Sequence, residues 1–216
     1  MTRPPSCLSE LRFAALLQYS PDGKTEMSQW SREHTRRIKR GSPAHIERIG
    51  LRSAEWAATG QLADFLGEDV ALVPVPRSKP FKDAGALWPA KRIAEELARR
   101  GLAGVVLPLL ERKEPIEKSA LQRAGSKRPG PEDHLRTIAV VHVLQASGRR
   151  IVLVDDVVTR GATLLGCATL LRRVLPDVEI VAFAAVRTVS GKEIEEMLAP
   201  VTGTISLVNG RPHREP

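Results

Sequence analysis

The stretch I-V-L-V-D-D-V-V-T-R-G-A-T, residues 151–163, decides the fold of this chain. Its first four residues are apolar and mostly β-branched, and the run is too short for a helix. It therefore predicts a strand buried on both faces of a parallel sheet, ending at Asp155 and Asp156. After the turn that contains Gly161, apolar residues at helical spacing predict a helix that begins near Ala162. Ligands of open α/β sheets bind at this carboxyl edge of the strands.

The residue types of this turn suit a phosphate beside a sugar. The first backbone N–H groups of a helix lack partners within the helix and carry partial positive charge, so they bind anions. Gly161 allows close approach of the backbone, and Thr159 and Thr163 add hydroxyl donors. The carboxylates of Asp155 and Asp156 accept hydrogen bonds, which suits sugar hydroxyls or a hydrated cation. The pattern predicts a ribose 5-phosphate site, and the alternative is a buried strand whose acids only cap the next helix.

Residues 152–163 resemble the phosphoribosyl-pyrophosphate (PRPP) motif of the type I phosphoribosyltransferases. In that family four apolar residues precede two acids, two further apolar residues, a Thr-rich turn, Gly and Thr. The chain departs from this pattern at Arg160, where many members have a small residue. Together with residues 72–79, the motif makes the chain most similar to the ComF-like, competence-associated branch, over roughly residues 70–189.

The resemblance implies three groups of site residues. Asp155 and Asp156 are expected to hold the ribose hydroxyls, and Arg112 is a further catalytic candidate. The segment that would bind the 5-phosphate comprises Val157, Val158, Thr159, Arg160, Gly161, Ala162 and Thr163. The segment that would bind pyrophosphate comprises Arg77, Ser78 and Lys79, and the alternative is an ordinary surface turn stiffened by prolines. Mg²⁺ is expected to bind through PRPP, and no protein ligand for a metal is predicted.

The implied activity is transfer of a 5-phosphoribosyl group from PRPP to a nitrogen acceptor, with release of pyrophosphate. The acceptor is not indicated, because no motif marks a base pocket. Members that use 6-oxopurines carry a third carboxylate in the turn after the two acids, whereas this chain has Thr159 there. The alternative is a non-catalytic PRPP- or nucleotide-binding protein that acts as a regulator or in DNA uptake and processing, because a fold does not fix a function.

Composition narrows the class of protein. The chain has 216 residues, of which 42% are hydrophobic, and its formal net charge is +8. The basic excess fits an anionic ligand; nucleic acid is less favoured, because aromatic residues that stack on bases make up only 4%. No apolar run reaches the roughly 20 residues that cross a bilayer, and no apolar signal-peptide segment follows Met1. We expect a cytoplasmic protein with no membrane partner. The sequence does not decide between a monomer and a homodimer.

Two cysteines, Cys7 and Cys167, are too few for the zinc ribbon that many ComF-like members carry near the N-terminus. The polar segment 111–133 has no regular apolar period and contains many basic residues and three prolines. Such a segment predicts a functional or mobile loop, and the resemblance implies a catalytic loop that closes over PRPP. His134, which follows it, is predicted to be a surface residue, with a general acid as the alternative.

Alternating strands and helices predict an α/β fold, a Rossmann-like parallel sheet with helices on both faces. The resemblance specifies the type I phosphoribosyltransferase fold, with an α-rich N-terminal extension. The expected domains are an extension or hood over residues 1–69, a phosphoribosyltransferase core over 70–189, and a helix, strand and mobile tail over 190–216. The predicted strands cover residues 12–19, 71–73, 104–110, 135–144, 151–154, 179–186 and 201–208. The predicted helices cover residues 28–39, 46–66 with an interruption near Gly60, 84–100, 162–174 and 190–198.

Overall fold

A computed structural model of the protein describes residues 7–80, 86–116, 129–142 and 150–216. A seven-stranded sheet, mostly parallel, forms its centre in the order β3-β2-β6-β7-β1-β8-β9. Its strands are β1 (Glu10–Tyr19), β2 (Gly67–Pro74), β3 (Ala103–Val106), β6 (Arg150–Val158), β7 (Ile180–Thr188), β8 (Leu198–Val208) and β9 (Arg211–Glu215). A second, antiparallel sheet pairs β4 (Leu110–Arg112) with β5 (Ile138–Val140). The predicted α/β class is confirmed.

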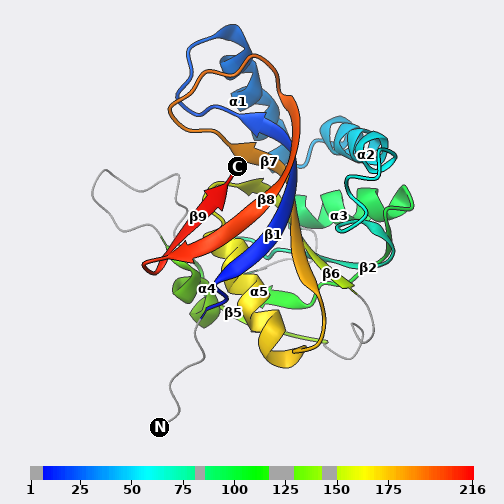
Figure 1. Ribbon diagram of the computed structural model, residues 1–216, viewed down its shortest axis with the longest axis vertical. Helices are drawn as coiled ribbons and strands as arrows, with labels where there is room; N and C mark the ends of the chain where they lie inside the picture. The colour runs from blue at the N-terminus through cyan, green and yellow to red at the C-terminus, as the bar shows by residue number, and fades with distance from the viewer. Residues whose placement is uncertain (1–6, 81–85, 117–128, 143–149) are drawn as a thin grey trace.

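Helices cover both faces of the central sheet, as predicted. They are α1 (Glu26–Lys39), α2 (Pro43–Ala57), α3 (Pro89–Arg99), α4 (Pro131–Thr137) and α5 (Ala162–Val174). Figure 1 shows α2 and α3 on one side of the sheet and α4 and α5 on the other. Successive strand residues point to opposite faces. Ile151 and Leu153 of β6 therefore pack in the core that contains α5, whereas Val152 and Val154 pack in the core of α1, α2 and α3.

The strand order changes direction between β2 and β6. From β2 the chain passes through α3 to β3 at one edge, and from β6 it passes through α5 to β7 on the other side. This change of direction is the switch point at which open α/β sheets bind ligands. β2 and β6 are parallel with Pro74 opposite Val154, and the Val75 N–H donates to the Val154 carbonyl at 2.9 Å. The segments that follow the two strands therefore emerge side by side.

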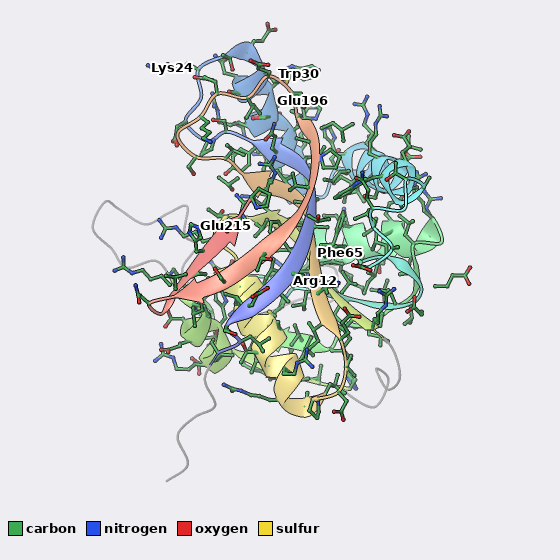
Figure 2. The ribbon with its side chains drawn as sticks, in the orientation of Figure 1. Arg12, Lys24, Trp30, Phe65, Glu196 and Glu215 are labelled. Atoms are coloured by element: carbon green, nitrogen blue, oxygen red, sulfur yellow. The ribbon has the colours of Figure 1, made fainter. Side chains whose placement is uncertain are left out.

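The predicted boundary at residue 70 falls within one sheet. β1 lies inside the sheet, parallel to β7 and antiparallel to β8. Arg12 of β1 also lies over the ring of Phe65, 5.6 Å from its centroid (Figure 2). The N-terminal residues thus contribute a strand to the sheet as well as the helices α1 and α2.

Two predicted elements near the C-terminus are wrong. The helix predicted over residues 190–198 is absent, since residues 190–197 are irregular and Leu198 begins β8. Glu193 of this segment instead holds the start of another helix: its carboxylate accepts hydrogen bonds from the Lys24 and Thr25 N–H groups before α1. The predicted mobile tail is strand β9, which pairs with β8 from Val208 opposite Arg211 onward. Figure 1 shows these two strands as a hairpin beside β1.

Other elements differ from prediction in their bounds. The described part of the expected strand 135–144, up to residue 142, begins as the end of α4 and continues as the short β5. The expected strand 104–110 is divided between β3 and β4. The predicted helical stretch 46–66, with its expected interruption near Gly60, is α2 up to Ala57 and turns after it. α3 begins at Pro89, five residues after the expected start. Residues 117–128 of the predicted loop 111–133 lie outside the described residues, and its two ends belong to β4 and α4.

Candidate functional site

The two acids lie inside β6 rather than after its end. β6 continues to Val158, and its register with β7 runs from Ile151 opposite Ile180 to Val158 opposite Arg187. Pairing with β7 therefore holds Asp155 and Asp156 near the carboxyl end of this central strand. The prediction that the strand ends before the acids is corrected by this continued pairing.

The turn after β6 depends on Gly161. This residue is the N-cap of α5 with φ 87°, a conformation that side chains rarely adopt, and its carbonyl accepts from the Leu165 N–H at 2.9 Å. A Cβ at Gly161 would also lie 2.6 Å from carbons of Ile205 on β8. The absence of a side chain at Gly161 thus allows β8 to approach the turn closely; the predicted approach of a phosphate to this backbone stays a prediction.

A cavity of about 590 Å³ opens at the start of α5, a volume typical of small-molecule sites. It brings Asp155 together with the whole segment predicted to bind the 5-phosphate, residues 157–163. The lining is completed by two residues that precede α4, one residue within α4, a further residue of α5 and the tip of the β8–β9 hairpin: Pro129 and Gly130, His134, Leu164, and Gly210, Arg211 and Pro212. The hairpin wall was not predicted, because nothing in its sequence relates it to the motif.

The carboxylates of the motif are half-buried and adjacent. The Asp155 carboxylate accepts the Asp156 N–H at 2.9 Å, and the Asp156 carboxylate accepts the Val157 N–H at 3.0 Å. Burial, followed by the charge of Asp156, raises the pKa of Asp155 well above its usual value. Lys39, at the end of α1, acts in the opposite direction and lowers it. Asp155 lines the cavity. The negative charge of Asp156 and the positive charge of Lys39 therefore have opposite effects on its ionisation.

Arg214 of β9 fixes the turn from the side of the hairpin. It donates from Nε to the Thr159 carbonyl at 2.9 Å and from Nη2 to the Thr188 carbonyl at 2.6 Å. Burial, followed by the charge of Arg187, lowers its pKa to about 10. The Thr159 hydroxyl, predicted as a phosphate donor, lies 3.1 Å from the Thr188 hydroxyl. Thr159 is therefore also a link between β6 and β7.

The residues predicted to bind pyrophosphate follow the strand next to β6 and do not line the cavity. Arg77, Ser78 and Lys79 follow β2, which pairs with β6. The Arg77 carbonyl accepts from Arg112 Nε at 2.8 Å, and the Ser78 carbonyl accepts from the Ile116 N–H at 2.8 Å. These hydrogen bonds attach the loop to the segment that begins at β4.

Arg112 faces the protein interior rather than a ligand. It is 2% exposed, and it donates to the Arg77 carbonyl and to the Thr137 hydroxyl. Its Nη2 lies 3.3 Å from His134 Nδ1. Desolvation by burial lowers the pKa of its guanidinium. The donors of Arg112 therefore point at groups of the protein, and its expected catalytic role stays a prediction.

His134 is buried, so the surface prediction is wrong. It is 6% exposed and lines the cavity, with Nε2 3.3 Å from the Thr163 hydroxyl. Burial, then the charge of Arg112, lowers its pKa to about 4. Its neighbours in sequence are mostly polar, so no sequence signal distinguished it from a surface histidine.

Within the described residues, no group of three or more His, Cys, Asp or Glu side chains is arranged to hold a metal ion. No described helix has the length and apolar character to cross a membrane. Comparison of the chain with protein-family models and with curated proteins finds no match. The site must therefore be interpreted from its own geometry and chemistry.

Proposed function

We propose that the protein binds Mg²⁺–PRPP and transfers its 5-phosphoribosyl group to a nitrogen acceptor, with release of pyrophosphate. The observation that carries the proposal is the joining, in one cavity, of the Asp155 carboxylate with the N-terminal turn of α5. Donors for a phosphate and an acceptor for hydroxyls then lie at neighbouring positions. A ribose 5-phosphate presents this pair of groups.

The 5-phosphate is assigned to the start of α5. The N–H groups of the first helical turn have no partner inside the helix, and the helix dipole favours an anion there. α5 has 13 residues and no acidic residue in its first turn, so no charge within that turn opposes a phosphate. Arg160 and Arg211 are exposed and line the cavity, which adds positive charge at its rim.

The ribose is assigned to the carboxyl end of β6. Asp155 and Asp156 offer carboxylate oxygens to the ribose hydroxyls, and their negative charge stabilises the cationic character that develops on the ring as pyrophosphate departs. Both carboxylates are already held by backbone N–H groups, so little reorganisation is required on binding. The departing pyrophosphate is assigned to residues 77–79, beside the end of β6.

Oxygen donors suit Mg²⁺, and the half-buried carboxylates of Asp155 and Asp156 fit a hydrated ion that PRPP itself holds. Bound in this way, Mg²⁺ would neutralise the charge that grows on pyrophosphate. The protein's own part is to fix the 5-phosphate and the ribose so that the anomeric carbon faces the acceptor.

Isothermal titration calorimetry with Mg²⁺–PRPP, ribose 5-phosphate and single-stranded DNA tests the proposal. We expect binding of both phosphate ligands to the wild type and to a control, Glu132→Gln, whose side chain is exposed outside the cavity. Pyrophosphate release is then measured with ammonia and with several bases. Binding of PRPP without turnover for any acceptor would favour the non-catalytic alternative. DNA binding with a steep salt dependence and no PRPP binding would contradict the proposal.

A further inference from the structure

A chain of polar contacts leads from the protein interior to the cavity. Arg112 Nη2 lies 3.3 Å from His134 Nδ1, and His134 Nε2 lies 3.3 Å from Thr163 Oγ1. Arg112 and His134 are 2% and 6% exposed, so water does not compete strongly for these contacts. Thr163 lies in the first turn of α5 and lines the cavity.

Only one arrangement of protons fits this chain when His134 is neutral. A guanidinium donates hydrogen bonds and cannot accept them. His134 Nδ1 must therefore accept from Arg112, which leaves the proton on Nε2. The Nε2–H then donates to Thr163 Oγ1, so the Thr163 hydroxyl accepts from His134. Its own proton is free to point elsewhere, and the cavity lies beside it.

The close approach of α4 and α5 makes the chain of contacts possible. Gly166 lies one turn after Thr163, where a Cβ would be 2.7 Å from the His134 Cβ and 3.0 Å from the Pro131 carbonyl. Any larger residue at 166 would separate the two helices. Arg112 is held in turn by the Arg77 carbonyl and the Thr137 hydroxyl, so its guanidinium cannot turn away easily.

We propose that Arg112 and His134 are positioning residues that make Thr163 a hydrogen-bond donor toward the bound phosphate. With the N–H groups of α5, this gives the start of the helix donors only, a set that suits a fully ionised phosphate monoester. The inference rests on the proposed function for the identity of the phosphate. The proton arrangement itself does not depend on any ligand.

Nitrogen NMR of the ligand-free protein at neutral pH tests the proton arrangement. The ring signals of His134 are assigned by their loss in His134→Gln, and nitrogen shifts distinguish protonated from unprotonated ring nitrogens. We expect the Nε2–H form in the wild type and in Arg112→Lys, which retains an obligate donor. Arg112→Met, a variant of similar size without a donor, should show loss of this fixed preference. A wild-type ring protonated on Nδ1 would overturn the inference.

Binding of inorganic phosphate and ribose 5-phosphate tests the consequence. Thr163→Val removes the hydroxyl with little change of shape, and we expect about tenfold weaker binding, which corresponds to about 1.4 kcal/mol. Thr163→Ser should bind as the wild type does. Gly166→Ala contacts neither the ligand nor the Thr163 hydroxyl, but it should move His134 away from Thr163. We therefore expect weaker phosphate binding and the same loss of the fixed Nε2–H preference as in Arg112→Met. If Arg112→Met does not fold, the Thr163 pair and His134→Gln still decide the question.

The outcomes separate this inference from the proposed function. Equal binding of ribose 5-phosphate by the wild type and Thr163→Val would overturn the inference and leave the proposed ligand intact. Weaker binding in Thr163→Val but no turnover in the wild type would support the inference and contradict phosphoribosyl transfer. Failure of the wild type to bind either phosphate compound would overturn both.

Discussion

Gly161, which lines the cavity, packs against Ile205 of β8 so closely that a Cβ at Gly161 would lie 2.6 Å from Ile205 carbons. Ile205 is fully buried in the core on the α5 side of the sheet, between β1 and β9. The packing of β8 against the turn therefore fixes the position of the backbone at the start of α5 relative to the sheet. The C-terminal strands, though remote in sequence from the motif, determine its geometry.

We expect Gly161→Ala to lower the free energy of unfolding by about 2 kcal/mol or more, since it combines a positive φ with overpacking. The matched control is Gly60→Ala, where φ is 80° and nothing lies within 4 Å of the added carbon. That variant should lose about 1 kcal/mol, the cost of the backbone conformation alone. Urea unfolding measures both values. Equal losses would show that Ile205 moves aside and does not support the turn.

The Asp155 carboxylate is predicted to lower the stability of the folded protein at neutral pH and to strengthen PRPP binding. Its pKa is raised by burial and by Asp156, so its contribution to stability is present at low pH and is lost as pH rises through its raised pKa. Asp155→Asn should therefore melt at the same or a higher temperature than the wild type at pH 7. This difference should narrow as the pH falls, because the wild-type carboxyl becomes protonated.

The same substitution should weaken PRPP binding, and Asp155→Asn combined with Asp156→Asn should weaken it about a hundredfold or more, since each hydrogen bond to a charged group contributes about 1.5–3 kcal/mol. Thermal melting and calorimetry measure the two effects. The control is Asp177→Asn, an exposed residue outside the cavity, which should change neither. A double variant that melts far below the wild type would show that the acids are structural caps.

Glu193 is predicted to hold the start of α1. Its carboxylate accepts the Lys24 and Thr25 N–H groups at 2.7 and 3.1 Å and the Ser28 hydroxyl at 2.8 Å. These contacts, led by the Lys24 N–H, lower its pKa to about 2. The stabilisation is therefore present above the usual glutamate pKa and is lost as pH falls toward 2.

Glu193→Gln should speed hydrogen exchange of the amides of residues 24–29 at neutral pH without unfolding the sheet. Glu196→Gln is the control, because within the described structure its carboxylate makes no hydrogen bond; Figure 2 shows Glu196 in the same region, near Trp30. Unchanged exchange in Glu193→Gln would mean that Thr25, which caps α1 with its side chain, holds the helix start alone.

The central strands and α5 were predictable because burial dictates their residue types. β6 lies between two cores, so its apolar run and the helical spacing after Gly161 are both readable in the sequence. The alternating exposure of β9, R-P-H-R-E, carries no apolar face, so its pairing with β8 gave no sequence signal. His134 and Glu193 are set by long-range contacts, with Thr163 and with the start of α1, which local patterns do not encode.

Arg214 is predicted to matter for the turn as a bridging group rather than as a charge. Arg214→Lys keeps the charge, but one ammonium cannot reproduce the planar geometry that joins the Thr159 and Thr188 carbonyls. We expect a loss of about 1.5–3 kcal/mol in the free energy of unfolding and weaker ribose 5-phosphate binding. His213→Gln, an exposed change on the same strand, should have little effect. Unfolding in urea that is the same for Arg214→Lys and the wild type would contradict the bridging role.

The last prediction concerns the acceptor. In phosphoribosyltransferases that use 6-oxopurines, the turn after the acids supplies a third carboxylate that manages the purine proton, whereas this chain has Thr159 with its hydroxyl 3.1 Å from that of Thr188. A hydroxyl cannot take up a proton near neutral pH as a carboxylate does. We therefore expect no useful pyrophosphate release with guanine or hypoxanthine.

The assay supplies PRPP with guanine, hypoxanthine, adenine, orotate, uracil or ammonia in turn. Rapid turnover with guanine would contradict the argument from Thr159. If every acceptor is inactive although PRPP binds, Arg160→Thr distinguishes two reasons, because Arg160 is exposed on the cavity rim at a position where many phosphoribosyltransferases carry a small residue. Activity that appears in Arg160→Thr would identify Arg160 as a block to turnover. Continued inactivity with unchanged PRPP binding would indicate a protein that senses PRPP and does not consume it.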